Sequence, residues 1–108
     1  MSDDHIDAVF SALSDPTRRT VMRAISDQGQ ASATELASQI PVSRQAIIKH
    51  LTALSEAGLV SADRQGRQKR YRLTPQPLGE AMSWMAEVGA EWDERLLSLQ
   101  RFLRDRRA

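Results

Sequence analysis

Residues 32–58 read SATELASQIPVSRQAIIKHLTALSEAG. Ser32 and Glu35 have the spacing of a capping box, which predicts a short helix from there to about Ile40. A tight turn follows, and Ser43 is placed to cap a second helix. The stretch therefore predicts a helix-turn-helix over residues 32–57.

The second of these helices has an apolar face and a polar face. Ile47, Leu51 and Leu54 recur at helical spacing and predict the inward face, and Gly58 ends the helix as a left-handed cap. The opposite face is free to enter the major groove of DNA, with its first turns against base edges. We therefore expect DNA contacts from the outward and flanking residues Ser43, Arg44, Gln45, Ala46, Ile48, Lys49 and His50.

The side chains on this face suit particular groups of DNA. Arg44 can reach a guanine edge or a phosphate, Gln45 can pair with adenine through two hydrogen bonds, and Lys49 can bind phosphate or guanine. Ala46 and Ile48 can offer methyl groups to thymine. The sequence leaves Ile48 open between a thymine contact and packing within the domain.

Residues 59–73 predict a basic β-hairpin, with a turn at residues 65–67. A strand pair this basic repels itself unless phosphate neutralises it, and a narrow minor groove attracts arginine. Alternation along the second strand places Lys69 and Tyr71 on one side and Arg70 on the other, with Tyr71 expected to pack within the hairpin. We expect DNA contacts here from Arg64, Arg67, Lys69 and Arg70.

Helices are predicted on both sides of this region. Residues 1–13 form an amphipathic helix, and Asp15 followed by Pro16 predicts the start of another that ends near Gly29. After the hairpin, residues 78–103 carry apolar residues at alternating steps of four and three, the pattern of a helix pair.

One chain has too little apolar surface to cover so long a stripe. We therefore expect the first and last helices of two chains to form a homodimer, in which Gly89 permits close approach or a slight bend. The interface is predicted from Ile6, Val9, Phe10, Leu13, Met85, Gly89, Trp92, Leu96, Leu99 and Leu103.

Composition narrows the class of protein. The 108 residues fit one domain, 1–108, and the formal net charge is +1. Basic residues nevertheless gather between residues 36 and 79, as a partner such as DNA requires. There is no cysteine, no apolar run long enough to span a membrane and no secretion signal, so we expect a cytoplasmic protein with no membrane partner.

Several segments resemble the ArsR-type family of bacterial repressors. They are Leu13–Arg19, Val42–Leu51 and Leu54–Val60, and Gly66–Leu73 resembles the wing of that family. The resemblance implies a mainly α fold with a small β-hairpin: a winged helix-turn-helix of five helices and a two-stranded wing. It further implies a bacterial homodimer that binds an inverted-repeat operator in double-stranded DNA and reads it with the helix after Ser43.

The sequence departs from this family where many of its members bind metals. Residues 34–38 contain no thiol, and the acidic residues of the last helix have no histidine beside them. Carboxylates alone are poor ligands for transition metals, so we expect no metal site and no cofactor. Nothing resembles a nucleophile with its base or a phosphate-cradling glycine loop, so we expect no catalytic residues and no enzyme.

Two other functions stay open at this level. A winged helix can serve as a protein–protein interaction module, with the basic wing binding an acidic partner. Alternatively, the chain can be a sensor for a ligand or metal bound at the dimer helices. The sequence does not identify a small-molecule effector.

Overall fold

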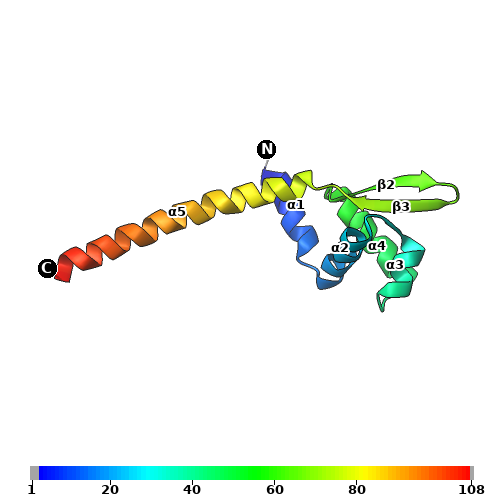
Figure 1. The fold of residues 1–108 in the computed structure, drawn as a ribbon, viewed down its shortest axis with the longest axis horizontal. Helices are drawn as coiled ribbons and strands as arrows, with labels where there is room; N and C mark the ends of the chain where they lie inside the picture. The colour runs from blue at the N-terminus through cyan, green and yellow to red at the C-terminus, as the bar shows by residue number, and fades with distance from the viewer. Residues whose placement is uncertain (1–2, 108) are drawn as a thin grey trace. The chain divides into compact units, whose positions relative to one another are not determined.

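The computed structural model describes residues 3–107 and is mainly helical (Figure 1). By contact, the chain divides into two units, one up to Leu78 and the other from Gly79. The elements in chain order are α1 (Asp3–Leu13), α2 (Pro16–Gln28), β1 (Ala31–Ser32), α3 (Ala33–Gln39), α4 (Arg44–Glu56), β2 (Val60–Gln65), β3 (Gln68–Leu73) and α5 (Gln76–Arg107).

The junction between α1 and α2 is held by its own charged side chains. Asp15 caps α2 by accepting a hydrogen bond from the Arg18 amide at 3.0 Å, and Pro16 follows in the first turn. The guanidinium groups of Arg18 and Arg19 donate to the last carbonyl oxygens of α1, including that of Leu13 at 2.6 Å. Positive charge at a helix C-terminus is stabilising, so this short segment fixes both helix ends.

The helix-turn-helix has the predicted caps. In the capping box, Ser32 Oγ accepts from the Glu35 amide at 3.1 Å, and the Ser32 amide donates to Glu35 Oε1 at 3.2 Å. Ser43 Oγ accepts from the Ala46 amide at 3.1 Å at the start of α4. Gly58 follows the end of α4 with φ of +76°, the left-handed conformation that glycine adopts without strain.

The core of the first unit lies among α2, α3, α4 and the start of β2. The predicted inward face of α4 is confirmed, since Ile47, Leu51 and Leu54 have no exposed surface. They share the core with Ile25 and Leu36, which are also fully buried. Burying this face fixes α4 with its other side outward.

The sheet has one strand more than the predicted hairpin. β2 and β3 pair antiparallel around Gly66, and β1 adds to the other edge of β3, giving the order β1-β3-β2. Ser32 of β1 lies opposite Arg70 of β3. The predicted two-stranded wing is confirmed as β2 and β3. β1 was not predicted, because a strand of two residues carries no alternation that a sequence pattern reveals.

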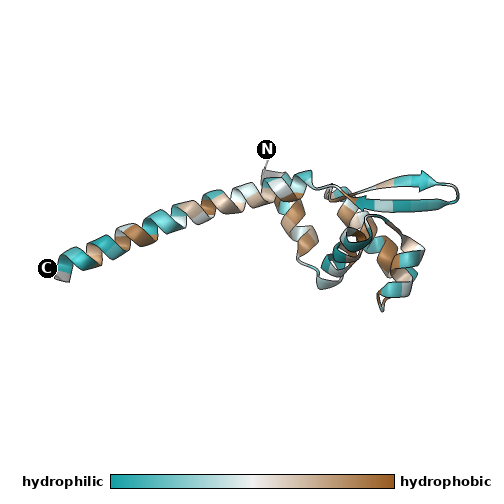
Figure 2. Ribbon diagram, viewed as in Figure 1, coloured by the Kyte–Doolittle hydropathy of each residue, from teal (hydrophilic) through white to brown (hydrophobic). Residues whose placement is uncertain are grey.

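The last helix is longer than predicted. α5 begins at Gln76, two residues before Leu78, because Pro77 falls in its first turn, where no amide partner is needed. It continues past Leu103 to Arg107. Figure 2 shows hydrophobic segments alternating with hydrophilic ones along this helix, whose C-terminal end is hydrophilic.

The first helix begins at Asp3, so residues 1–2 of the prediction lie outside the described part of the chain. Ile6 and Val9 are buried within the single chain, with 8% and 2% of their surface exposed. They leave almost no area for a second chain to cover. Phe10 and Leu13 are half-buried and keep some surface.

Candidate nucleic-acid interface

The outward face of α4 carries the side chains that the sequence assigns to DNA. Arg44, Gln45 and Lys49 are exposed, and Ala46 is half-buried. Ser43 is exposed too, although its hydroxyl oxygen already accepts the capping hydrogen bond. The start of α4 therefore presents one arginine, one amide and one lysine to solvent.

His50 lies one turn further on and is half-buried. The pKa of Asp15 is lowered mainly by its hydrogen bond from the Arg18 amide, and the charge of His50 lowers it further. Contact between His50 and DNA stays a prediction.

Ile48 differs from its neighbours because it is apolar. It is 38% exposed, and it is the only large hydrophobic side chain exposed among the described residues up to Leu78. It lines a groove of about 260 Å³ between α4, the start of α3 and the wing, together with Arg44, Arg67 and Lys69. An apolar side chain is thus surrounded by three cations, a combination suited to the edges and backbone of DNA.

The register of the wing separates its basic residues into two sets. Lys69 and Tyr71 lie opposite Arg64 and Ala62, whereas Arg70 lies opposite Asp63. Tyr71 is only 9% exposed, with the Lys69 ammonium 5.8 Å from its ring centroid. The predicted packing role of Tyr71 is confirmed.

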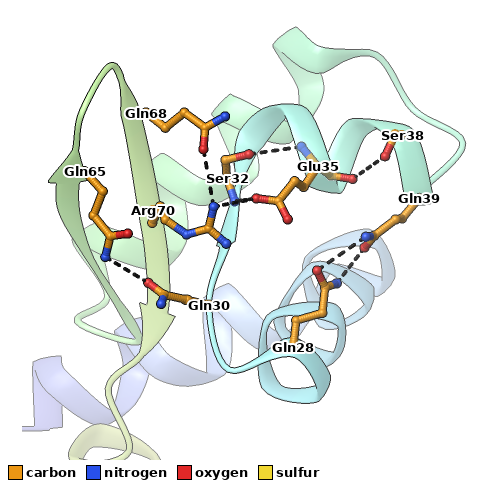
Figure 3. Close-up of polar contacts among 9 residues, drawn as sticks. All are labelled: Gln28, Gln30, Ser32, Glu35, Ser38, Gln39, Gln65, Gln68 and Arg70. Atoms are coloured by element: carbon orange, nitrogen blue, oxygen red, sulfur yellow. Dashed lines mark hydrogen bonds and ion pairs between the residues drawn. The ribbon is translucent and has the colours of Figure 1, made fainter.

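Two arginines of β3 are paired within the chain. Arg70 Nη1 lies 2.8 Å from Glu35 Oε1 (Figure 3), and Arg72 Nη1 lies 2.5 Å from Asp63 Oδ2. Arg64, Arg67 and Lys69 are exposed, and within residues 3–107 none of them forms an ion pair with a carboxylate. These three side chains therefore carry positive charge that no carboxylate of the described chain pairs with.

Glu35 has a second role that the sequence did not reveal. Its Oε1 atom closes the capping box and also accepts from Arg70. The hydrogen bonds from Ser32 are the main reason why the pKa of Glu35 is lowered, and the charge of Arg70 adds to the effect. The pair joins residues 35 positions apart through β1, the strand that the sequence pattern missed.

Most of the predicted dimer residues of α5 are exposed in the single chain. Met85, Trp92, Leu96, Leu99 and Leu103 each have about half of their surface exposed, and Gly89 is exposed as well. The same helix exposes four further large apolar residues: Met82, Trp84, Leu97 and Phe102. In the part of the chain that is described, α5 thus exposes large apolar side chains at intervals from Met82 to Leu103.

No helix in residues 3–107 is long and apolar enough to cross a membrane. Nor do those residues bring together three or more His, Cys, Asp or Glu side chains in a group that could hold a metal ion.

The helix-turn-helix, the wing and the exposed basic face define a winged helix-turn-helix, and comparison with known proteins agrees. Residues 13–61 match a family described as a helix-turn-helix domain. The chain is 36% identical over 78 residues to an HTH-type transcriptional regulator of Bacillus subtilis, YuzN, a match covering 67% of this chain and 85% of that protein. It is 34% identical over 77 residues to the transcriptional repressor SdpR of the same organism, covering 71% and 84%.

A solved structure is similar over nearly the whole chain. The ArsR-like transcriptional regulator from Rhodococcus sp. RHA1 superposes with a TM-score of 0.83 at 40% identity, covering 92% of each chain. The chain belongs to the ArsR-type family of winged helix-turn-helix transcriptional regulators. It is a DNA-binding regulator of transcription.

Proposed function

We propose that this protein is a repressor that binds an inverted-repeat operator as a homodimer. The observation that carries the proposal is the groove beside α4, where Arg44, Arg67 and Lys69 surround an exposed Ile48. Its relative SdpR is named a transcriptional repressor. Because bacterial operators lie in the cytoplasm, we place the protein there, with double-stranded DNA as its partner and no membrane partner.

Base reading belongs to the first turns of α4. Arg44 and Lys49 contact guanine edges or phosphates, and Gln45 pairs with adenine. Their exposure on one face of a helix whose other face is fully buried supports this assignment. Ser43, Ala46 and His50 contact DNA at the edge of this interface, beside the base-reading residues.

Ile48 contacts the methyl group of a thymine. A folded domain buries its large apolar side chains, and this unit leaves only Ile48 exposed within its described residues, on the face that meets DNA. The thymine methyl is the apolar group of the major groove, so it is the natural partner for an aliphatic side chain there. The contact buries apolar surface on both molecules.

The wing holds the DNA backbone. Arg64, Arg67 and Lys69 supply the positive charge, since none of them is neutralised by a carboxylate within the described chain. Arg67 lies beside Gly66, at the turn between β2 and β3, where it can reach furthest into a minor groove. These contacts add affinity without reading the sequence.

Two chains associate through α5. An apolar stripe at steps of four and three favours a helix pair, and Met85, Trp92, Leu96, Leu99 and Leu103 are exposed along it. Gly89 allows the paired backbones to approach closely, and Phe10 and Leu13 add area from α1. Two-fold symmetry then presents two α4 helices about 34 Å apart, one turn of DNA.

Selection from random-sequence duplexes tests the proposal. The protein is expected to enrich one inverted repeat whose half-sites are about 10 base pairs apart, centre to centre. Enrichment of a single unrepeated site would contradict the homodimer. Failure to enrich any sequence, together with binding that does not depend on salt, would contradict operator recognition altogether.

A further inference from the structure

One carboxylate connects the helix-turn-helix to the wing. Glu35 Oε1 accepts a hydrogen bond from the Ser32 amide at 3.2 Å and another from Arg70 Nη1 at 2.8 Å (Figure 3). The same Arg70 nitrogen lies 3.3 Å from Gln68 Oε1. The same Glu35 oxygen therefore completes the capping box of α3 and binds the guanidinium of Arg70 on β3.

The burial of the pair sets Arg70 apart from the other wing cations. The side chains of Arg70 and Glu35 are 22% and 39% exposed, whereas Arg67 and Lys69 are exposed. If Arg70 turned to a DNA phosphate, Glu35 would lose its partner and keep a negative charge near the DNA. Breaking a partly buried ion pair in this way costs free energy that an exposed lysine or arginine would not have to supply.

The Glu35–Arg70 pair connects α3 to the wing beside the pairing of β1 with β3. Ser32 lies opposite Arg70 in the β1–β3 ladder, and Glu35 is hydrogen-bonded to both residues. The three residues therefore form a closed set of contacts between the helix-turn-helix and the wing. α3 follows β1 directly and packs against α4. Glu35 is thus tied at one end to the helix that supports α4 and at the other to the wing.

We propose that Arg70 is a positioning residue: through Glu35 it fixes the wing relative to α4, and it makes no phosphate contact itself. This inference rests on the proposed function, since it concerns how the two DNA-contacting elements are kept in register. It also reassigns Arg70, which the sequence alone places among the DNA contacts. Phosphate binding by the wing then belongs to Arg64, Arg67 and Lys69.

Amide hydrogen exchange without DNA tests the pair directly. In Arg70→Gln and Glu35→Gln, the amides of β2 and β3 are expected to exchange about fivefold faster than in the wild type. Arg67→Gln, the matched control on the same hairpin, is expected to leave them unchanged. Wild-type protection of the wing in Arg70→Gln would overturn the proposal.

The variants are chosen so that folding is preserved. Glutamine can replace glutamate in a capping box, so Glu35→Gln keeps the start of α3 while removing the charge that holds Arg70. A cooperative melting transition in each variant confirms that local exchange, and not global unfolding, is being measured. Slower or unchanged exchange in Glu35→Gln would count against the pair even if Arg70→Gln were too unstable to study.

Salt dependence of DNA binding separates positioning from contact. On a duplex selected by the wild-type protein, Arg67→Gln is expected to lower the slope of log affinity against log salt by about 0.9 for each phosphate lost. Arg70→Gln is expected to bind about fivefold more weakly at every salt concentration with the slope unchanged. A reduced slope in Arg70→Gln would show a phosphate contact and overturn the proposal.

The double variant provides a further check. Because both residues act through one ion pair, Glu35→Gln combined with Arg70→Gln is expected to bind as weakly as Arg70→Gln alone. Tighter binding by Glu35→Gln than by the wild type would mean that Glu35 competes with DNA for Arg70. If the wild type selects no duplex, the proposed function fails, and the exchange experiment still decides whether the pair holds the wing.

Discussion

Arginines serve two different purposes in this chain. Arg18 and Arg19 donate to backbone carbonyls at the end of α1, and Arg72 pairs with Asp63. Arg44 and Arg67 point into a groove beside α4, and neither forms an ion pair within the described residues. A count of basic residues does not distinguish these purposes; the partner of each guanidinium does.

Removing one methyl group from DNA tests the role of Ile48. Replacing a contacted thymine by deoxyuridine is expected to weaken wild-type binding about fourfold, the effect of losing one buried methyl. Ile48→Ala is expected to bind thymine and deoxyuridine duplexes equally, as measured by titration. An equal loss on deoxyuridine substitution in both proteins would mean that another residue reads the methyl.

The capping carboxylates predict how stability changes with pH. Asp15 and Glu35 have lowered pKa values in the folded protein, chiefly because of backbone hydrogen bonds from Arg18 and Ser32. A lowered folded pKa stabilises the protein above the unfolded pKa, and this stabilisation is lost as the pH falls below about 4. Asp15→Asn and Glu35→Gln are each expected to show a smaller drop in Tm on acidification than the wild type.

At the scale of elements, helix ends were the most predictable feature. Ser32, Asp15, Ser43 and Gly58 each mark a boundary through a local hydrogen bond or backbone conformation, and the structure confirms all four. β1 was not predictable because two residues form a strand only when β3 is there to pair with them. Because β1 was not predicted, the link between α3 and the wing through Glu35 and Arg70 was not predicted either.

The cap of α4 can be measured on its own. Ser43→Ala removes the side-chain oxygen that accepts from the Ala46 amide, and is expected to lower the free energy of unfolding by about 1 kcal/mol. Ser38→Ala is the matched control, since Ser38 Oγ donates to a carbonyl within α3 and caps nothing. Equal stability of the two variants in a urea titration would contradict the role given to Ser43.

At the scale of the whole molecule, the sequence predicts several residues that line the candidate DNA-binding groove. It does not predict which apolar residues a single chain already buries. Of the predicted DNA contacts, Arg44, Ile48, Arg67 and Lys69 line one groove. Ile6 and Val9, which the sequence predicts at the dimer interface, are buried within the single chain. Periodicity identifies an apolar face without saying what covers it. That information comes from tertiary packing.

Disrupting the stripe of α5 tests the proposed dimer. Leu96→Asp combined with Leu99→Asp places two charges on residues that are about half exposed in the single chain, so the fold of the first unit is expected to survive. Sedimentation is expected to give a monomer, with operator affinity sharply reduced. A variant that still sediments as a dimer would rule out this part of α5 as the interface.

The central claim is that α4 and the wing bind DNA as one surface, with α4 reading the sequence and the wing binding the backbone. Its most direct test compares Gln45→Ala with Arg67→Gln on the selected operator and on an unrelated duplex over a range of salt. Gln45→Ala is predicted to lose about 10-fold or more on the operator only. Arg67→Gln is predicted to lose affinity on both duplexes, with a shallower salt slope. Wild-type affinity and slope in both variants would contradict the account.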